Sequence, residues 1–316
     1  VAVENGLIVA VGSEASLTPL VKAREGKVDR QFAEQIMLPG FIDPHVHPAL
    51  PAVLTQFPFL APDDWSLPTG EFPGETTPKG YRTRLTELAA QHNDPSVPFI
   101  VWGYHPLWHG KIWRQELNEW FGDQPVMLWH RSFHELIGND AAWKLLGVTQ
   151  EDAPIEEGVD WERGHFYENG LKAVIPKLNF LFAPERFGPG MFNFLAMLHQ
   201  AGVTTALDMG TGVYGNPTAE IAGVRAAADA YPVPTRLILT PIILDFLTRE
   251  QSPTDALAEI RHWQKDNDDR VSIGNHFKLM IDGAIFSGLA QMGPPGYLDG
   301  HKGVWMVPEP ALRAYA

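Results

Sequence analysis

Alternation between strand and helix patterns in the second half of the chain constrains the fold more than any other feature. Three segments have the apolar pattern of strands: Val203–Met209, Thr235–Leu244 and His276–Ile281. Three others have a helical pattern: Met191–Ala201, Thr218–Ala230 and Thr254–Lys265. Strands that alternate with helices are typical of a parallel sheet, because each parallel connection has to cross the sheet. The sequence therefore predicts an α/β fold.

An earlier apolar segment, Ile36–Asp43, adds a first strand, which Pro39-Gly40 interrupts and Pro44 closes. Four such strands match about the first half of a (β/α)8 (TIM) barrel, which needs eight strands in roughly 250 residues. About 150 residues separate the first strand from the second, so we expect a long insert over residues 50–190 of a barrel domain that covers residues 36–316. We also expect further sequence at both ends of the chain.

Shorter elements are predicted outside these segments. A β-hairpin is expected over Val1–Val11, because Asn5-Gly6 is a strong turn signal between two apolar runs. Asn139 can cap a helix that Gly147 ends. The other predictions are helices over Tyr81–His92, Asn139–Leu146 and Pro308–Tyr315, strands over Pro98–Tyr104 and Val126–Trp129, and mainly loop over residues 50–80 and 150–190.

Charge and hydropathy exclude several classes of function. The chain has 38 acidic and 24 basic residues and a net charge of −14, which repels nucleic-acid phosphates, so no nucleic-acid partner is expected. Thr, Pro and Asp interrupt the longest apolar run, Leu237–Phe246, so no membrane span is predicted. Val1–Ala10 lacks the basic region and cleavage site of a signal peptide, and a cytoplasmic location is expected.

Two residue counts bear on the kind of site. The chain has no Cys, so any metal ion must bind His, Asp, Glu or a modified Lys. It has ten Trp, many of them between Trp65 and Trp161. These indole rings are expected to pack in the core, or alternatively to form the wall of a pocket for an apolar substrate.

His45 and His47 are the first candidates for metal ligands. They lie two residues apart on an extended segment, so both imidazoles point to the same face. At the carboxyl end of a barrel strand that face is the mouth of the active site, where two imidazoles can bind one divalent ion. The alternative is a pair of histidines at the start of a loop.

The segment Pro39-Gly40-Phe41-Ile42-Asp43-Pro44-His45-Val46-His47 resembles the first barrel strand of the amidohydrolase superfamily. A second segment, His276–Gly283, is similar to the fourth strand of the branch that includes YtcJ-like proteins and N-substituted formamide deformylase. In that branch the lysine at the position of Lys278 is carboxylated and bridges two metal ions. A bare ammonium group is costly in this apolar strand, which agrees with such a modification. The alternative is that Lys278 reaches solvent or pairs with Asp282.

Weaker matches to the same branch extend the resemblance over most of the chain. They comprise Trp102-Gly103-Tyr104, His134 to Asn139 and Gly164 to Glu168, whereas Gly202 to Gly210 matches the second strand of that branch well. The resemblance implies four candidates for substrate binding: Trp102, His134, Glu168 and Asp282. Asp43 is expected to support the fold or a ligating His, and Asp208 is expected to be either a functional group at a strand end or a loop cap.

The resemblance implies hydrolysis of a C–N bond other than a peptide bond, in an amide or formamide, by water that one or two Zn²⁺ ions activate. Two further His ligands and the general-base Asp would lie beyond Ala316, so residues 1–316 alone are expected to be inactive. Residues 1–35 would be part of a composite β-sandwich. The alternatives are a deaminase or imidazolonepropionase-like hydrolase of the same barrel, or a binding module without catalysis. The expected partners are a small-molecule substrate and a second copy of the chain.

Overall fold

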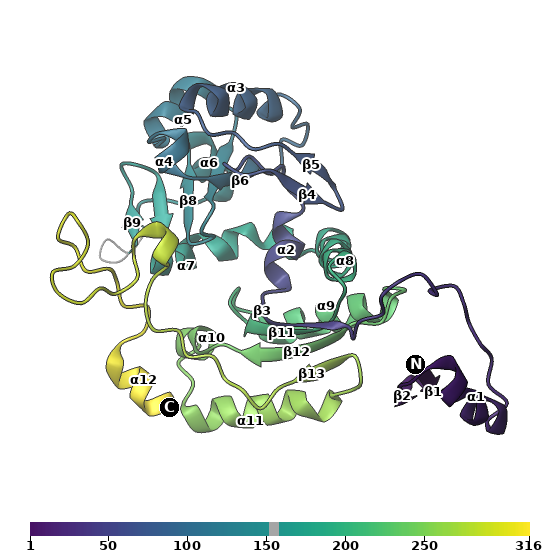
Figure 1. Ribbon diagram of the computed structural model, residues 1–316. Coiled ribbons are helices and arrows are strands. Elements are labelled where there is room, and N and C mark those ends of the chain that lie inside the picture. The colour runs from purple at the N-terminus through teal and green to yellow at the C-terminus, as the bar shows by residue number, and fades with distance from the viewer. Residues whose placement is uncertain (152–157) are drawn as a thin grey trace. The chain divides into compact units, whose positions relative to one another are not determined.

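The computed structural model describes residues 1–151 and 158–316, which divide into two compact units, Val1–Gly40 and Phe41–Ala316 (Figure 1). No helix among the described residues is both long and apolar enough to cross a membrane.

The first unit consists of a hairpin and one helix. Strands β1 (Ala2–Glu4) and β2 (Leu7–Ala10) pair antiparallel, as predicted. The turn between them works because Asn5 and Gly6 both adopt positive φ, of 51° and 77°. Helix α1 (Glu14–Ala23), which the sequence pattern did not indicate, begins where the Ser13 side chain accepts a hydrogen bond from the Ser16 N–H.

The second unit contains the predicted parallel sheet of four strands. They are β3 (Phe41–Val46), β11 (Val203–Thr211), β12 (Arg236–Pro241) and β13 (Val271–Ile273), and they neighbour each other in chain order. The mixed α/β class is therefore confirmed. Three helices pack against the sheet through one shared apolar core: α8 (Pro184–Gln200), α9 (Pro217–Ala230) and α11 (Pro253–Trp263). Ser252 caps α11 and Asn216 caps α9.

The predicted strand His276–Ile281 is wrong. The fourth strand is β13, whose Val271 and Ile273 are buried, and the Asn267 side chain bonds both the N–H and the C=O of Ile273 at its end. Residues 276–281 keep only a single parallel bridge, between Lys278 and Ile242. Residues 277–280 are partly buried, but the segment lies beyond the end of the β12–β13 pairing and does not form part of it.

The first strand also differs from its predicted bounds. β3 begins at Phe41, where the Phe41 N–H bonds the Gly202 carbonyl at 2.9 Å and pairing with β11 starts, whereas Ile36, Met37 and Leu38 are exposed and unpaired with the sheet. It continues through Pro44 to Val46. Proline is tolerated there because β3 lies at the edge of the described sheet, where a missing N–H breaks no ladder bond.

The insert is more regular than the sequence predicted. It contains a five-stranded sheet in the order β6-β7-β8-β10-β9, in which only β6 and β7 are parallel. Its strands are β6 (Phe99–Tyr104), β7 (Val126–His130), β8 (Glu135–Gly138), β9 (Val159–Asp160) and β10 (His165–Tyr167). Two were predicted, and the other three are too short for a clear apolar pattern. Trp102, Trp129 and Trp143 are buried among these elements, which confirms core packing for these rings.

Short helices and a small hairpin complete this unit. Asn139 caps α6 (Asp140–Leu146) and Gly147 ends it at a φ of 62°, both as predicted. The predicted loops contain helical turns and strands, so the loop prediction for residues 50–80 and 150–190 is wrong in part. The remaining elements are α2 (Ala49–Leu54), β4 (Trp65–Leu67), β5 (Gly70–Phe72), α3 (Pro78–Ala89), α4 (Pro106–His109), α5 (Arg114–Phe121), η1 (Glu168–Gly170), α7 (Leu171–Val174), η2 (Ile175–Phe182), α10 (Ile243–Thr248), η3 (Gln264–Asp266), η4 (Ile285–Ser287) and α12 (Glu309–Tyr315).

Contact between α2 and α8 gives a test of the packing that holds the segment after His47. A Cβ at Gly190 would lie 1.9 Å from the backbone oxygen of Ala52, which a side-chain rotation cannot relieve. We expect Gly190→Ala to lower the free energy of unfolding by about 2–3 kcal/mol, measured by urea denaturation with tryptophan fluorescence.

The matched control is Gly223→Ala in α9, where the new methyl group would meet a ring carbon of Phe187 at 3.1 Å. A side chain can shift by the few tenths of an ångström needed, so we expect the change to stay below about 1 kcal/mol. Equal losses in the two variants would contradict the close backbone contact.

Candidate functional site

Strand register brings His45 and His47 to the carboxyl edge of the parallel sheet. Val46 lies opposite Asp208 in the β3–β11 ladder, so His45 and His47 flank the position that faces Asp208. The ring centroids of His45 and His47 are 5.2 Å apart, and the rings are nearly perpendicular. Nδ1 of His47 lies 3.6 Å from Oδ1 of Asp208.

Two aspartates organise the backbone around these rings. Asp43 Oδ1 accepts a hydrogen bond of 3.1 Å from the His45 N–H. Asp208 is buried, and it accepts hydrogen bonds from the Gly210 N–H at 2.9 Å and from the Thr211 hydroxyl. Asp208 therefore caps the loop, as one of the two alternatives predicted, and it also faces His47. Gly210 is required here, because a Cβ would lie 2.8 Å from Nδ1 of His47.

Lys278 reaches the same edge from beyond β13. Its N–H donates to the Pro241 carbonyl at 2.9 Å, and its own carbonyl accepts from the Ile243 N–H at 3.0 Å. Within the described residues, the ammonium group makes no hydrogen bond or ion pair. Burial lowers the pKa of Lys278, although the nearby negative charge of Asp208 opposes the shift.

Charges from these groups also act on His45. Burial has the largest effect and lowers the pKa of His45, and the positive charges of His47 and Lys278 lower it further. His45 and Lys278 are thus both shifted toward the neutral forms, and a metal ion needs a neutral imidazole as ligand.

These donors fit part of a divalent metal site. Two adjacent imidazoles are common ligands of Zn²⁺, and a lysine can join them only as a modified, anionic group. No group of three or more His, Asp or Glu side chains in the described part of the chain is arranged to hold a metal ion. His45, His47 and Lys278 therefore form at most an incomplete ligand set.

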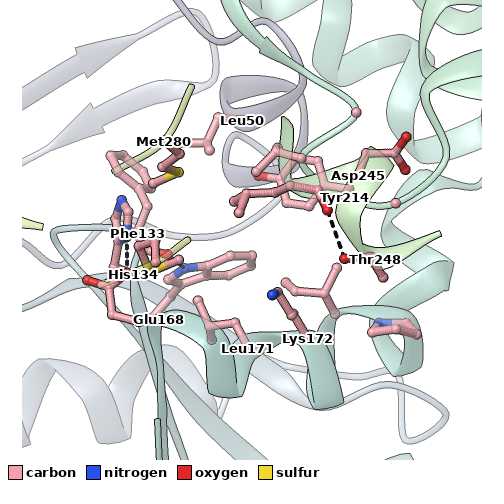
Figure 2. A pocket seen from close by; sticks show the side chains of 18 residues that line it. Leu50, Phe133, His134, Glu168, Leu171, Lys172, Tyr214, Asp245, Thr248 and Met280 are labelled. Carbon is pink, nitrogen blue, oxygen red and sulfur yellow. Dashed lines mark hydrogen bonds and ion pairs between the residues drawn. The ribbon is translucent and has the colours of Figure 1, made fainter. Parts of the chain in front are cut away.

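A cavity of about 190 Å³ lies near this edge, between the insert and the loops that follow the sheet strands (Figure 2). Its walls are mainly apolar and aromatic: Leu50, Trp129, Phe133, Leu171, Tyr214, Leu244, Met280 and Met306. Leu50 follows the His45–His47 segment in the chain, and Met280 follows Lys278. His134, Glu168 and Asp245 contribute polar groups to the lining.

His134 and Glu168 are brought together in this lining. Nδ1 of His134 lies 2.7 Å from Oε2 of Glu168, and Oε1 of Glu168 accepts a hydrogen bond of 2.7 Å from the Ala284 N–H. Gly283 permits this approach, because a Cβ there would lie 2.9 Å from Glu168 Oε1. The insert is thereby tied to the loop that follows Lys278.

The two other candidates for substrate binding lie outside the cavity lining. Trp102 is buried in the core of the insert, where its ring stacks on Phe133 at 5.2 Å between centroids. Asp282 Oδ2 accepts a hydrogen bond of 2.7 Å from the Gln291 N–H and holds its own loop.

Sequence reasoning missed Trp129, Tyr214 and Asp245 in the cavity. Tyr214 and Asp245 follow the carboxyl ends of β11 and β12, and that position alone could have marked them. Burial raises the pKa of Asp245, against the opposing effect of its ion pair with Arg249. Trp129 had no distinguishing signal among the other tryptophans.

Comparisons with known proteins agree with this architecture. The family described as "Amidohydrolase family" matches residues 33–316. An uncharacterized metal-dependent hydrolase from Pyrococcus horikoshii OT3 superimposes with a TM-score of 0.63 at 16% identity, over 98% of this chain and 56% of that one. An uncharacterized metal-dependent hydrolase from Pyrococcus furiosus gives a TM-score of 0.60 at 16% identity, over 99% of this chain and 60% of that one.

The chain thus spans between half and two thirds of the length of these two solved structures. No curated protein sequence matches it. The family match covers most of the chain, including the segments that carry His45, His47 and Lys278, and the chain belongs to the amidohydrolase family.

Proposed function

We propose that the chain is part of a metal-dependent hydrolase whose metal ligands include His45, His47 and Lys278. The observation that carries the proposal is their convergence: residues more than 200 positions apart in sequence meet at one edge of the parallel sheet, around Asp208. Membership of the amidohydrolase family supports the same reading.

The proposed metal is Zn²⁺, because nitrogen donors without thiolates are typical of catalytic zinc. When bound, the ion would supply Lewis-acid chemistry, polarising a carbonyl group and lowering the pKa of water. His45 and His47 would hold one ion through neutral imidazoles. The donor set is too small for a complete site, so we infer that further ligands complete it.

Lys278 is proposed to carry a carboxyl group on Nζ. The unmodified ammonium group is half-buried, makes no ion pair with a described residue, and lies close enough to His45 to lower the pKa of that residue. Carboxylation replaces this positive charge by an anionic group with two oxygen donors, which suits a position between two metal ions.

The proposed substrate is an amide or formamide with an apolar substituent, hydrolysed at a C–N bond other than a peptide bond. His45, His47 and Lys278 do not line the apolar and aromatic cavity, but Leu50 and Met280, which follow them closely in the chain, do, and its lining supports this class. We further propose that β3, β11, β12 and β13 are strands of a (β/α)8 barrel of the YtcJ-like branch. Their parallel order and the position of the site at their carboxyl ends support that assignment.

Zinc binding tests the ligand assignment directly. His47→Ala should weaken Zn²⁺ binding at least about tenfold, because it removes one of two adjacent imidazoles. The measurement is metal content by mass spectrometry after dialysis against buffered Zn²⁺.

The matched control for zinc binding is His262→Ala, at an exposed position in the last turn of α11. It should retain the zinc content of the unchanged protein. If both variants keep that content, His47 is not a ligand and the proposed site is wrong.

Carboxylation of Lys278 can be tested without any substrate. Protein equilibrated with ¹³C-bicarbonate should give a carbamate carbon signal in its NMR spectrum. Lys278→Arg should abolish the signal, because arginine keeps the positive charge but does not form a stable carbamate.

Lys265→Arg is the matched control for the carbamate signal, since Lys265 is an exposed lysine in η3. It should leave the signal unchanged. A zinc-loaded protein without a Lys278-dependent signal would instead favour a single-metal hydrolase of the deaminase type.

A further inference from the structure

The carboxylate of Glu168 is fully engaged inside the protein. Oε2 pairs with Nδ1 of His134 at 2.7 Å, and Oε1 accepts the Ala284 N–H at 2.7 Å. Only 2% of its side-chain surface is exposed. Glu168 therefore has little capacity left for a substrate, although it borders the cavity.

His134 is the member of the pair that remains accessible. Its side chain is 29% exposed and lines the cavity, while Nδ1 is turned toward Glu168 (Figure 2). A carboxylate only accepts hydrogen bonds, so Nδ1 must carry the proton. In the neutral ring Nε2 then has a free lone pair. No hydrogen bond from a described residue reaches this nitrogen.

The backbone next to His134 and at Glu168 is strained. Phe133, next to His134, has a φ of 70°, and Glu168 has a φ of 46°. Positive φ is rare for such residues and strains the backbone. The Glu168 N–H bonds the His134 carbonyl at 2.9 Å, which helps to hold both residues. Strain of this kind persists at sites where the position of a side chain matters.

We propose that Glu168 is a positioning residue that fixes the tautomer of His134, so that Nε2 accepts a hydrogen bond from the N–H group of an amide substrate. The substrate role of the cavity rests on the proposed function. Trp129, Phe133 and Leu50 would surround the apolar substituent of that amide. A primary or secondary amide satisfies Nε2, whereas a tertiary amide or an ester has no N–H to donate.

Glu168→Gln tests the tautomer with little change of shape. The Ala284 N–H needs an acceptor, so the glutamine oxygen should turn toward it and the NH2 group toward Nδ1 of His134. Nδ1 would then accept, and the proton would move to Nε2. Nitrogen-15 NMR at a pH above 8, where a free imidazole is neutral, distinguishes the two tautomers.

We expect the proton on Nδ1 in the unchanged protein and on Nε2 in Glu168→Gln. The control is Glu116→Gln. The Glu116 carboxylate accepts a hydrogen bond of 2.8 Å from the Trp113 N–H and does not contact His134. It should leave His134 unchanged. A proton on Nε2 in the unchanged protein, or the same tautomer in both, overturns the role of Glu168.

Binding of a probe pair tests the substrate contact. N-methylbenzamide carries the N–H group and N,N-dimethylbenzamide lacks it. The unchanged protein should bind the first about fivefold to tenfold more tightly in an NMR titration of the His134 ring, as one hydrogen bond allows. Glu168→Gln should lose this preference. An equal response of the unchanged protein to both amides, including no response to either, overturns the contact.

Zinc content separates this inference from the proposed function. Glu168→Gln should bind zinc as the unchanged protein does, because Glu168 does not touch the proposed ligands. The tautomer measurement needs no metal and no turnover. Failure to bind zinc, with the expected tautomers, would contradict the proposed function but not the role of Glu168. Normal zinc binding, with other tautomers than expected, would contradict the role of Glu168 but not the proposed function.

Discussion

The site depends on the register of β3 against β11. In this parallel pair Val46 lies opposite Asp208, and the shared edge follows from that single alignment. A shift by one residue would turn His45 and His47 to the opposite face. The register is held from both sides: the Phe41 N–H bonds the Gly202 carbonyl at 2.9 Å, and α2 packs on α8 through Gly190. The segment Phe41–Leu54 therefore carries both the candidate ligands His45 and His47 and the helix that packs on α8.

Electrostatics at this edge are unfavourable for the bare protein. Two imidazoles and one ammonium group lie around a single buried carboxylate, Asp208, which already accepts two hydrogen bonds. Burial and mutual repulsion both favour neutral His45, and burial favours neutral Lys278. The carboxylated Lys278 that we propose would remove one of these positive charges, and the divalent ion that we propose would bind the imidazoles in their neutral form.

Sequence periodicity predicted β11 and β12 because their apolar residues are buried against helices close to them in the chain. It also predicted the cap at Asn139 and the hairpin turn at Asn5-Gly6, which depend on local geometry. It misplaced the fourth strand, since the end of β13 is decided by the Asn267 side chain rather than by hydropathy. His45, His47 and Lys278 could be named as candidates because the segments around them resemble a known family, although residues 276–281 form no strand. The aromatic wall could not be predicted, because nothing local separates Trp129, which borders the cavity as well as the core, from Trp102, which lies in the core alone.

The insert and the sheet contribute different halves of the candidate site. The sheet edge supplies His45, His47 and Lys278, whereas the insert supplies His134 and most of the aromatic wall. Glu168 joins the two, because it contacts His134 and the backbone of Ala284 at the same time. Each carboxylate oxygen faces one donor, and a Cβ at position 283 would lie 2.9 Å from Oε1, so glycine there lets the loop approach this closely. A change at this contact should therefore alter the orientation of His134 before it alters the sheet.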